Sequence, residues 1–519
     1  MRLCALFLLA LAPLAAQYQN WTIYGANVGS QRYSPLRQIN ASNVSRLTVN
    51  WVFQPRVEGN FEATPLFEDG ILYFTGPGGH AWALDARTGR DLWHYHRPIP
   101  EKQGMCCGPL NRGFALKGDR LFLVTIDSHV EALDKKTGRL LWDTEMADYK
   151  EGYSATVAPL LVKDKIVVGI AGADMGTRGF VDAYYIDTGK RAWRFWTIPG
   201  PGEKGSETWT GEAWSRGGGS AWVTGSYDPA LNLVYWGIGN PGPDLNGDVR
   251  PGANLFSDCM VALDADTGKL KWYYQFTPHD THDWDGVNEP ILADLTIHGV
   301  PRKVLLHADR NGFAYAIDRV EGKPVWGHPF VKTTWAEKLD SNGNPVVKPG
   351  TDPTKDGVEA CPGLGGGKNW NHAAFNPDTG LFYVPSAEEC EVFFSSDAPR
   401  EAGRLWMGSV NEAIPKHKAT GALRAFDARD GHLVWEFKTI RPHRGSVLTT
   451  GGDLVFAGDG QGYFTAFHAR TGKVLWKLEA GAGISAPAMT YEMDGRQYIA
   501  VIAGAALFTF ALPPEAAGR

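Results

Sequence analysis

The chain has 519 residues and a formal net charge of −6, with 43% hydrophobic and 21% charged residues, as in ordinary globular proteins. This charge gives no electrostatic reason to expect a nucleic-acid partner or an anionic membrane surface. The 19 tryptophans and 62 glycines favour an all-β chain, because aromatic residues are enriched in strands and glycines in the turns between them.

The N-terminus predicts a secretory signal peptide. It has one Arg, an apolar run from Leu3 to Leu11 and small residues ending at Ala16. The run is too short to span a bilayer, and no later segment approaches twenty apolar residues, so no membrane span is expected. We therefore predict a signal peptide over residues 1–16 and export to the periplasm.

One phrase recurs seven times and predicts a series of β-hairpins. An apolar strand ends in an Asp, Asp-x-x-Thr-Gly forms a tight turn, and a second strand ends in Trp. The copies read ALDARTGRDLW (to Trp93), ALDKKTGRLLW (Trp142), AYYIDTGKRAW (Trp193), ALDADTGKLKW (Trp272), AIDRVEGKPVW (Trp326), AFDARDGHLVW (Trp435) and AFHARTGKVLW (Trp476). We expect each Trp to dock between neighbouring sheets.

The spacing of the copies predicts an eight-bladed β-propeller. Successive tryptophans are mostly about 40 to 55 residues apart, which fits four-stranded blades. Longer intervals would carry insertions, such as the Gly- and Pro-rich residues 327–367. The segment LTVNWVF around Trp51 looks like an eighth hairpin end, so the N-terminal strand would complete the last blade and close the ring. Residues 17–519 would then be one domain.

The cysteines leave two pairings open. Cys106 and Cys107 are adjacent and could remain two thiols or close a strained ring, since export permits disulfides. Cys361 and Cys390 could pair, which would leave Cys259 as a buried thiol. The chain contains no C-x-x-C-H motif, so covalent haem is not expected on it.

The candidate site residues lie in glycine-rich segments between the hairpins, as expected where loops converge on a propeller axis. They comprise hard oxygen ligands, two cations and a flat ring: Asp174, Asn240, Asp283, Asp285, Arg112, Arg310 and Trp222. Oxygen ligands suit Ca²⁺-like ions, arginines suit an anion, and an indole suits a planar molecule. The set predicts a flat polyanion bound together with a hard cation.

The segment PHDTHDWDGVNEP places three aspartates close together, so something must neutralise them. If the segment is extended, Asp283 and Asp285 share a face and could both meet a cation. Asp280 is expected to be a structural turn residue outside the site. His279 and His282 could indicate zinc, but their loop setting favours a role in shaping the loop or contacting substrate.

These motifs carry a family resemblance. The segments CCGPLNRG, GGGSAW, YDPALNLVYWGIGNPGP and PHDTHDWD, with the repeated DxxTGxxxW, resemble the PQQ-dependent (quinoprotein) alcohol dehydrogenases, the methanol/ethanol dehydrogenase family. The resemblance covers nearly the whole mature chain. It implies an eight-bladed propeller that holds pyrroloquinoline quinone between the Trp222 ring and a Cys106–Cys107 disulfide. The Cys361–Cys390 spacing resembles the second disulfide of the family.

By the same resemblance, further residues line the cofactor: Glu62, Arg112, Thr156, Ala171, Gly172, Ala173, Ser220, Arg310 and Asn369. Trp370 either contacts the cofactor or packs beside it. Asp174, Asn240 and Asp283 match metal or catalytic positions, although the family usually has Glu in place of Asp174. A carboxylate at Asp285 resembles the lanthanide-dependent members, so the resemblance leaves Ca²⁺ and a lanthanide open.

The implied activity is metal-assisted oxidation of a primary alcohol to an aldehyde by hydride transfer to the quinone. Asp283 is the expected base and Arg310 the group that holds the quinone oxygen. Without a haem motif, a soluble cytochrome c is the expected electron acceptor. Two alternatives remain, a quinoprotein acting on a sugar or polyol and a non-catalytic envelope propeller scaffold. A homodimer also stays open.

Overall fold

The computed structural model describes residues 18–514 except residues 102, 398 and 416, so the predicted signal peptide lies outside the described residues. Strands and loops make up nearly all of this part. Its helices are short 3-10 turns: η1 (Val44–Arg46), η2 (Pro77–Gly79), η3 (Tyr149–Glu151), η4 (Ala173–Met175), η5 (Ser206–Thr208) and η6 (Ala213–Arg216). No helix in this part is long and apolar enough to cross a membrane.

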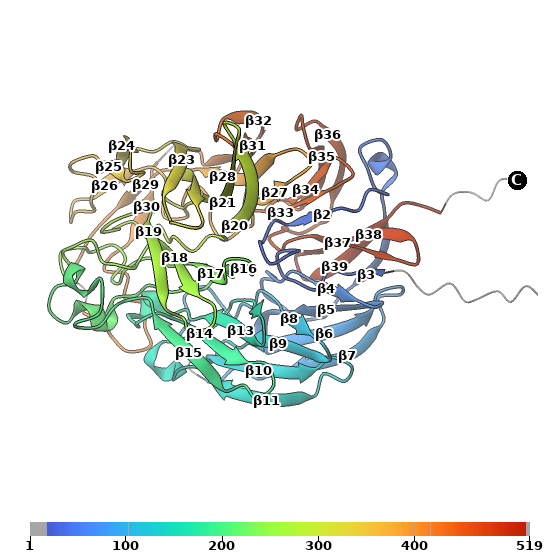
Figure 1. Cartoon of the computed structure of the whole chain (residues 1–519), viewed down its shortest axis with the longest axis horizontal. Helices are drawn as coiled ribbons and strands as arrows, with labels where there is room; N and C mark the ends of the chain where they lie inside the picture. The colour runs from blue at the N-terminus through green and yellow to red at the C-terminus, as the bar shows by residue number, and fades with distance from the viewer. Residues whose placement is uncertain (1–17, 102, 398, 416, 515–519) are drawn as a thin grey trace, which may run out of the picture.

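Four-stranded antiparallel sheets follow one another along the first half of the chain (Figure 1). They are β4 (Leu66–Glu68), β5 (Ile71–Thr75), β6 (His80–Asp85) and β7 (Asp91–His96); β8 (Ala115–Lys117), β9 (Arg120–Val124), β10 (His129–Asp134) and β11 (Leu140–Glu145); β12 (Leu160–Val162), β13 (Lys165–Gly169), β14 (Phe180–Tyr185) and β15 (Arg191–Trp196); and β16 (Ser226–Asp228), β17 (Leu233–Gly237), β18 (Cys259–Asp264) and β19 (Leu270–Gln275).

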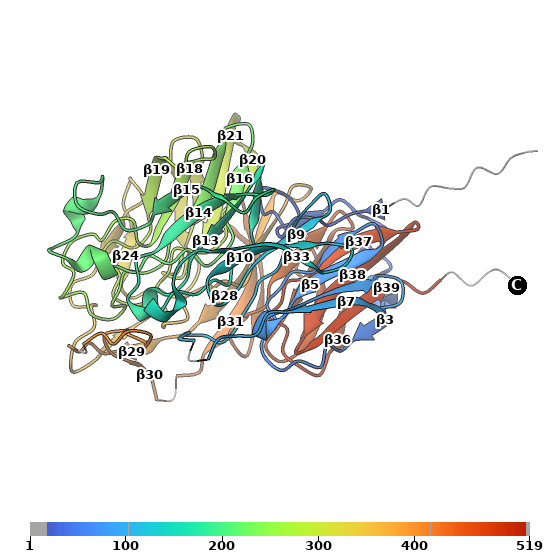
Figure 2. The ribbon, with the colours of Figure 1, turned by 90° about the horizontal axis from the view of Figure 1, so that it is seen from below.

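The second half continues the pattern with sheets of four or five strands. They are β20 (Ile291–Ile297), β21 (Val300–Ala308), β22 (Phe313–Asp318) and β23 (Pro324–Pro329); β27 (Ala374–Asn376), β28 (Leu381–Glu388), β31 (Thr420–Asp427) and β32 (Leu433–Thr439); β2 (Tyr33–Ser34), β33 (Val447–Thr450), β34 (Leu454–Gly458), β35 (Tyr463–His468) and β36 (Val474–Glu479); and β1 (Tyr18–Gln19), β37 (Met489–Met493), β38 (Arg496–Ala503), β39 (Ala506–Ala511) and β3 (Thr48–Phe53). The successive sheets lie around a common centre, which makes the fold an all-β propeller (Figures 1 and 2).

The predicted insertion forms small sheets of its own. Residues 327–367 contribute β24 (Ala336–Leu339) and β25 (Pro345–Val347), which pair with each other, and β26 (Val358–Ala360). β26 pairs with β29 (Glu391–Phe393), which in turn pairs with β30 (Asn411–Ala413). The Cys361–Cys390 disulfide joins this insertion to the segment between β28 and β29, as expected, and Cys259 is a buried free thiol.

All seven repeats are hairpins, as predicted, and they are the last two strands of their sheets. In the turn between β10 and β11, the Asp134 carboxylate accepts the backbone N–H of Thr137 (2.9 Å) and its hydroxyl (2.8 Å). Gly138 follows with a φ of +69°, a conformation that glycine adopts without steric cost. The local chemistry of the motif therefore determines the turn.

Each hairpin tryptophan binds the neighbouring sheet, as expected. The indole N–H of Trp93 donates to the carbonyl of Lys135 (3.0 Å), and that of Trp142 donates to Ile186 (3.1 Å). The turn glycine of the next sheet packs on the same ring: a Cβ at Gly189 would lie 2.6 Å from Trp142. The repeat thus couples one sheet to the next through a hydrogen bond and a close contact.

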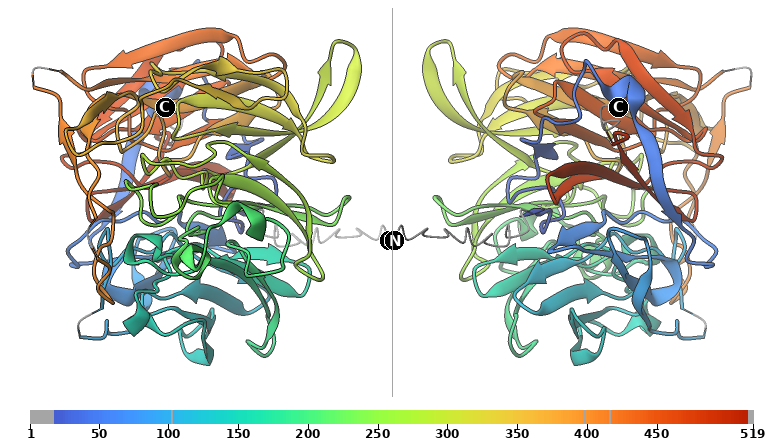
Figure 3. Two further views of the ribbon diagram at one scale, coloured as in Figure 1. Left: turned by 90° about the vertical axis from the view of Figure 1, so that its left-hand side faces the viewer. Right: turned by 90° about the vertical axis from the view of Figure 1, so that its right-hand side faces the viewer.

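Strand β3 pairs with β39 near the C-terminus, with Trp51 opposite Thr509. The blue β3 lies beside the red C-terminal strands in Figure 2 and in the right-hand view of Figure 3. Trp51 donates to the carbonyl of Ala86 (3.0 Å), and Trp476 donates to Leu47 (3.1 Å). β3 is therefore linked to its neighbours by the same kind of tryptophan contact that links the other sheets.

Candidate active site

A cavity of about 390 Å³ lies where the loops between the sheets converge. Every predicted site residue except Ala173 lines it: Glu62, Cys106, Cys107, Arg112, Thr156, Ala171, Gly172, Asp174, Ser220, Trp222, Asn240, Asp283, Asp285, Arg310, Asn369 and Trp370. The backbone N–H of Ala173 instead donates to the hydroxyl of Ser220 (2.8 Å), so this residue positions a lining residue. Segments hundreds of residues apart thus meet in one pocket.

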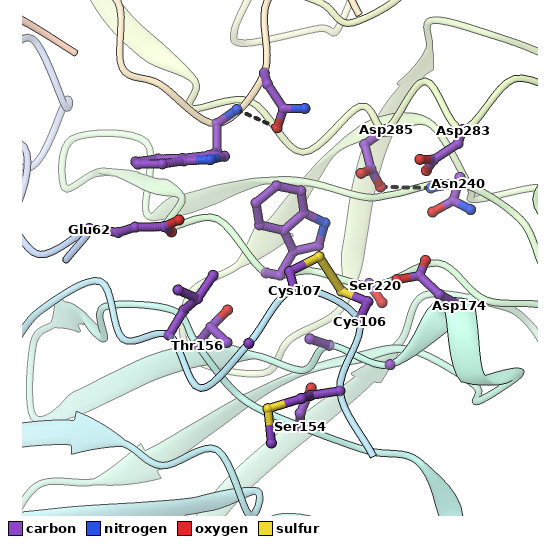
Figure 4. A pocket seen from close by; sticks show the side chains of 18 of the residues that line it. Glu62, Cys106, Cys107, Ser154, Thr156, Asp174, Ser220, Asn240, Asp283 and Asp285 are labelled. Atoms are coloured by element: carbon purple, nitrogen blue, oxygen red, sulfur yellow. Dashed lines mark hydrogen bonds between the residues drawn. A yellow bond between two sulfur atoms is a disulfide. The ribbon is translucent and has the colours of Figure 1, made fainter. Parts of the chain in front are cut away.

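A disulfide and an indole supply flat apolar surface in the pocket. Cys106 and Cys107 form a disulfide, as expected, and Figure 4 shows it projecting into the cavity between Glu62 and Asp174. Trp222 also lines the cavity, and the Arg112 guanidinium lies 4.7 Å from the centre of its ring. Such surfaces suit a planar ligand.

Arg112 anchors one polar side of the cavity. Its guanidinium forms an ion pair with Glu62 (2.7 Å) and donates to the hydroxyl of Thr156 (2.6 Å). It also lies 5.2 Å from the ring centre of Trp370. Arg112 and Glu62 are almost fully buried, and burial raises the pKa of Glu62. A buried, hydrogen-bonded arginine is well placed to recognise a carboxylate-bearing ligand.

The aspartate-rich segment forms the opposite polar side, although its backbone is not extended at Asp283. Asp283 has a φ of +61°, an uncommon conformation for a residue other than glycine. One Arg310 nitrogen donates to Asp283 (3.0 Å), and another donates to Asp285. The irregular backbone still directs both carboxylates to one side, and Arg310 neutralises part of their charge (Figure 4 shows Asp283 and Asp285).

Asp280 is a structural turn residue, as expected. Its carboxylate accepts the backbone N–H groups of His282 (3.0 Å) and Trp284 (2.8 Å). The ring of His282 contacts the carbonyl of Thr351 (3.0 Å) and stacks on Trp284, and burial lowers its pKa to about 4. Neither histidine lines the cavity, and the His279 ring contacts the carbonyl of Gly252 (2.9 Å), so both help to shape the loop.

A group of carboxylates offers oxygen atoms to a common point. One oxygen each from Asp174, Asp244 and Asp283 lie within 4.8 Å of one another. Burial and the nearby Asp285 raise the pKa of Asp174 to about 6, while burial above all raises the pKa of Asp244 and Asp283 well above the usual range. Carboxylates gathered in this way favour a cation between them.

Comparisons with known proteins match this arrangement to one family. Residues 21–334 and 440–499 match the family model of the glucose/ethanol/alcohol dehydrogenase β-propeller domain that binds PQQ. The chain is 40% identical over 507 residues to quinoprotein alcohol dehydrogenase PedH of Pseudomonas putida, covering 92% of this chain and 85% of that protein. The chain belongs to the PQQ-dependent alcohol dehydrogenase family.

Two further members of the family bear on the metal. The chain is 38% identical to a lanthanide-dependent methanol dehydrogenase of Methylacidiphilum fumariolicum, covering 95% of this chain and 86% of that protein. It superimposes on a europium-containing methanol dehydrogenase with a TM-score of 0.89 at 36% identity, covering 95% and 98%. The likeness to these quinoproteins makes the chain an enzyme of this family.

The residues present fit a quinone and a hard cation. The disulfide and Trp222 provide flat surface, and Arg112 provides a cation for an anionic substituent. The donor set for the ion consists of oxygen atoms, which suit Ca²⁺ or a lanthanide and not zinc. In the described part of the pocket, the Nε of Arg310 has no hydrogen-bond partner, as expected where a ligand completes the site.

The sequence prediction missed several lining residues and one acidic residue behind them. Asn60, Met105, Ile126, Ser154 and Leu364 are among the additional residues that line the cavity. Apolar members of this set carry no signal in the sequence. Asp244 does carry one, because it is a carboxylate in the glycine- and proline-rich segment that already supplies Asn240.

Proposed function

We propose that the protein oxidises a small primary alcohol to an aldehyde, using pyrroloquinoline quinone and one Ca²⁺ or lanthanide ion. The observation that carries the proposal is that one cavity combines flat apolar surface with a cluster of aspartate carboxylates that can hold a cation. The cavity of about 390 Å³ is near the lower end of the usual range for ligand sites, about 300–1,000 Å³. This volume favours a small alcohol beside the cofactor over a sugar or polyol.

When bound, the quinone supplies a two-electron acceptor and the cation acts as a Lewis acid. Asp283 is the proposed base that takes the hydroxyl proton of the alcohol, because its carboxylate lines the cavity and is oriented by Arg310 (3.0 Å). A carboxylate beside cations stays ionised in the assembled site, even though burial raises its pKa here.

Arg310 is the proposed second catalytic residue. Arg310 is almost fully buried. Burial lowers the pKa of its guanidinium, but the neighbouring carboxylates of Asp283 and Asp285 raise this pKa by more, so Arg310 stays cationic. A fixed positive charge at this position would stabilise negative charge that develops on a bound ligand during the reaction. The remaining proposed ligands of the ion are Asp174, Asn240 and Asp285.

The wider context of the reaction is also proposed. A soluble cytochrome c would accept the electrons, and the signal peptide over residues 1–16 would direct the protein to the periplasm. The sheets would be eight blades of one domain, residues 17–519, with the N-terminal strand closing the ring. The tryptophan contacts that join β3 to its neighbours support this closure.

Reconstitution tests this function. Purified protein is loaded with the quinone and either Ca²⁺ or La³⁺, and dye reduction is followed with a series of primary alcohols, polyols and sugars. Faster reduction with short primary alcohols supports the proposal. A preference for polyols or sugars would assign the alternative substrate class, and an absence of quinone binding would contradict the activity and favour the scaffold alternative.

A further inference from the structure

Asp244 is a buried carboxylate that forms no ion pair among the described residues. Its side chain is 0% exposed. One carboxylate oxygen accepts a hydrogen bond from the Nδ2 of Asn240 (2.7 Å), and the other has no hydrogen-bond partner among the described residues. Such a group is costly to bury alone. The nearby Arg250 donates to backbone carbonyls, including those of Pro243 and Asp280, and not to the Asp244 carboxylate.

The position of Asp244 indicates that a bound cation could be the partner of its carboxylate. One of its oxygens lies within 4.8 Å of oxygens of Asp174 and Asp283, which the proposed function assigns to the ion. Asp285 does not belong to this close group, and its oxygens are occupied by Arg310 and by the backbone N–H of Asn240 (3.0 Å). Asp244 therefore offers the ion an oxygen without a hydrogen-bond partner, in addition to the proposed ligand Asp285, whose two oxygens already accept hydrogen bonds.

We propose that Asp244 is a further carboxylate ligand of the ion in this chain, and that it favours a trivalent ion over a divalent one. The inference rests on the proposed function, because it needs the ion that Asp174 and Asp283 hold. The four carboxylates of Asp174, Asp244, Asp283 and Asp285, set against Arg310, leave about three negative charges if all ionise. Arg250 also lies near Asp244, but it faces two further carboxylates, those of Asp280 and Asp258. A lanthanide would balance this charge, whereas Ca²⁺ would leave one negative charge buried.

Asn240 links Asp244 to the pocket. Its Nδ2 donates to Asp244, which leaves its amide oxygen as the atom that would bind the same ion. Asn240 lines the cavity, whereas Asp244 does not. The ion would therefore be reached from the cavity through Asn240, Asp174 and Asp283, while Asp244 holds it from the protein side.

Metal binding tests the inference without any turnover. Apoprotein is titrated with Eu³⁺ and with Ca²⁺ by calorimetry, and luminescence lifetimes in H₂O and D₂O give the number of waters on bound Eu³⁺. Wild type is compared with Asp244→Asn, which keeps the shape and the acceptor for Asn240. Asp248→Asn, at an exposed carboxylate of the same loop, is the matched control.

We expect Asp244→Asn to weaken Eu³⁺ binding by about 100-fold and to weaken Ca²⁺ binding less, since losing a side chain that only hydrogen-bonds to a metal ligand already costs about 10–100-fold. About one additional water should occupy the vacated position on Eu³⁺. Asp248→Asn should behave as wild type. If Asp244→Asn does not fold, Asp244→Ser removes the same ligand with a smaller side chain, and the same losses are expected.

Three outcomes would overturn the inference. Unchanged affinity and hydration in Asp244→Asn would mean that Asp244 stays protonated and does not bind the ion. Equal weakening in Asp248→Asn would indicate a long-range charge effect without ligation. An absence of binding of either ion to wild type would overturn the metal part of the proposed function as well, which separates that failure from a failure of Asp244 alone.

Discussion

The outer hairpins and the central cavity differ in how completely their carboxylates are satisfied by hydrogen bonds. In the hairpin turns, carboxylates such as Asp134 have their hydrogen bonds made by the next few residues. Around the cavity, Asp244 and Asp258 have oxygens with no described partner, and Asp283 has a positive φ. Unsatisfied groups and an unusual backbone conformation at one place indicate a site that a ligand completes. The polar groups of the hairpins thus stabilise the fold, whereas carboxylates around the cavity keep oxygen atoms free to bind a ligand.

The largest expected effect comes from removing the proposed base. Asp283→Asn should lower the turnover number by about 10²–10⁴-fold, the usual contribution of a general base. Quinone binding should change little, because the flat surfaces and Arg112 remain. Dye reduction by reconstituted enzyme measures the first quantity and equilibrium dialysis the second, with Asp248→Asn as the control. Unchanged turnover would remove Asp283 from the mechanism.

Trp222→Ala tests the flat wall of the cavity. Losing the indole should weaken quinone binding by roughly 30-fold, corresponding to about 2 kcal/mol, because a buried aromatic contact is removed. Quenching of protein fluorescence by the quinone measures the affinity. The unfolding midpoint of the apoprotein serves as the control for folding. Wild-type affinity in a folded variant would place the quinone away from this wall.

In the hairpins, Gly189→Ala should reduce stability without changing the kinetics of folded enzyme. Gly189 has a φ of +67°, and a Cβ would lie 2.6 Å from Trp142, so the cost should be about 2–4 kcal/mol. Gly380→Ala is the matched control, since Gly380 has a φ of +73° but nothing within 4 Å. It should cost only about 1 kcal/mol in denaturant unfolding. Equal costs would show that the indole contact contributes nothing.

The last expected effect concerns the pH dependence of stability. Burial, with Asp280 and Asp285 nearby, raises the pKa of Asp258 well above its usual range. The folded state therefore binds this proton more strongly than the unfolded state does. The contribution of the protonated Asp258 to the free energy of unfolding is complete at low pH and is lost as the pH rises. Asp258→Asn should unfold at higher denaturant concentration than wild type, and the difference should grow as the pH rises above the ordinary aspartate pKa of about 4. A difference independent of pH would contradict the shift.

The fold was largely predictable because its information is local. Each Asp-x-x-Thr-Gly turn forms from adjacent residues, and the recurring Trp indicated how the sheets contact one another. The pairing of β3 with β39 also followed, since LTVNWVF has the ending of a hairpin without its turn.

The site was predicted less completely because its geometry depends on contacts between distant segments. Its residue types were recognisable, and almost all of the predicted residues line one cavity. Asp283 and Asp285 both line the cavity, but not through the extended backbone that the sequence analysis considered, because the positive φ of Asp283 and the bonds to Arg310 arise from tertiary structure. The proximity of Asp244 to Asp174 likewise cannot be read from a sequence.

The central claim is that an alcohol reduces a quinone bound in this cavity, and an anaerobic single-turnover experiment tests it most directly. Enzyme loaded with quinone and La³⁺ or Ca²⁺ is mixed with a primary alcohol without any electron acceptor. The absorption spectrum of the cofactor and the yield of aldehyde are then measured. We predict reduction of the bound quinone with about one aldehyde formed per quinone. Quinone that binds but stays oxidised in the presence of alcohol, with no aldehyde formed, would contradict the account.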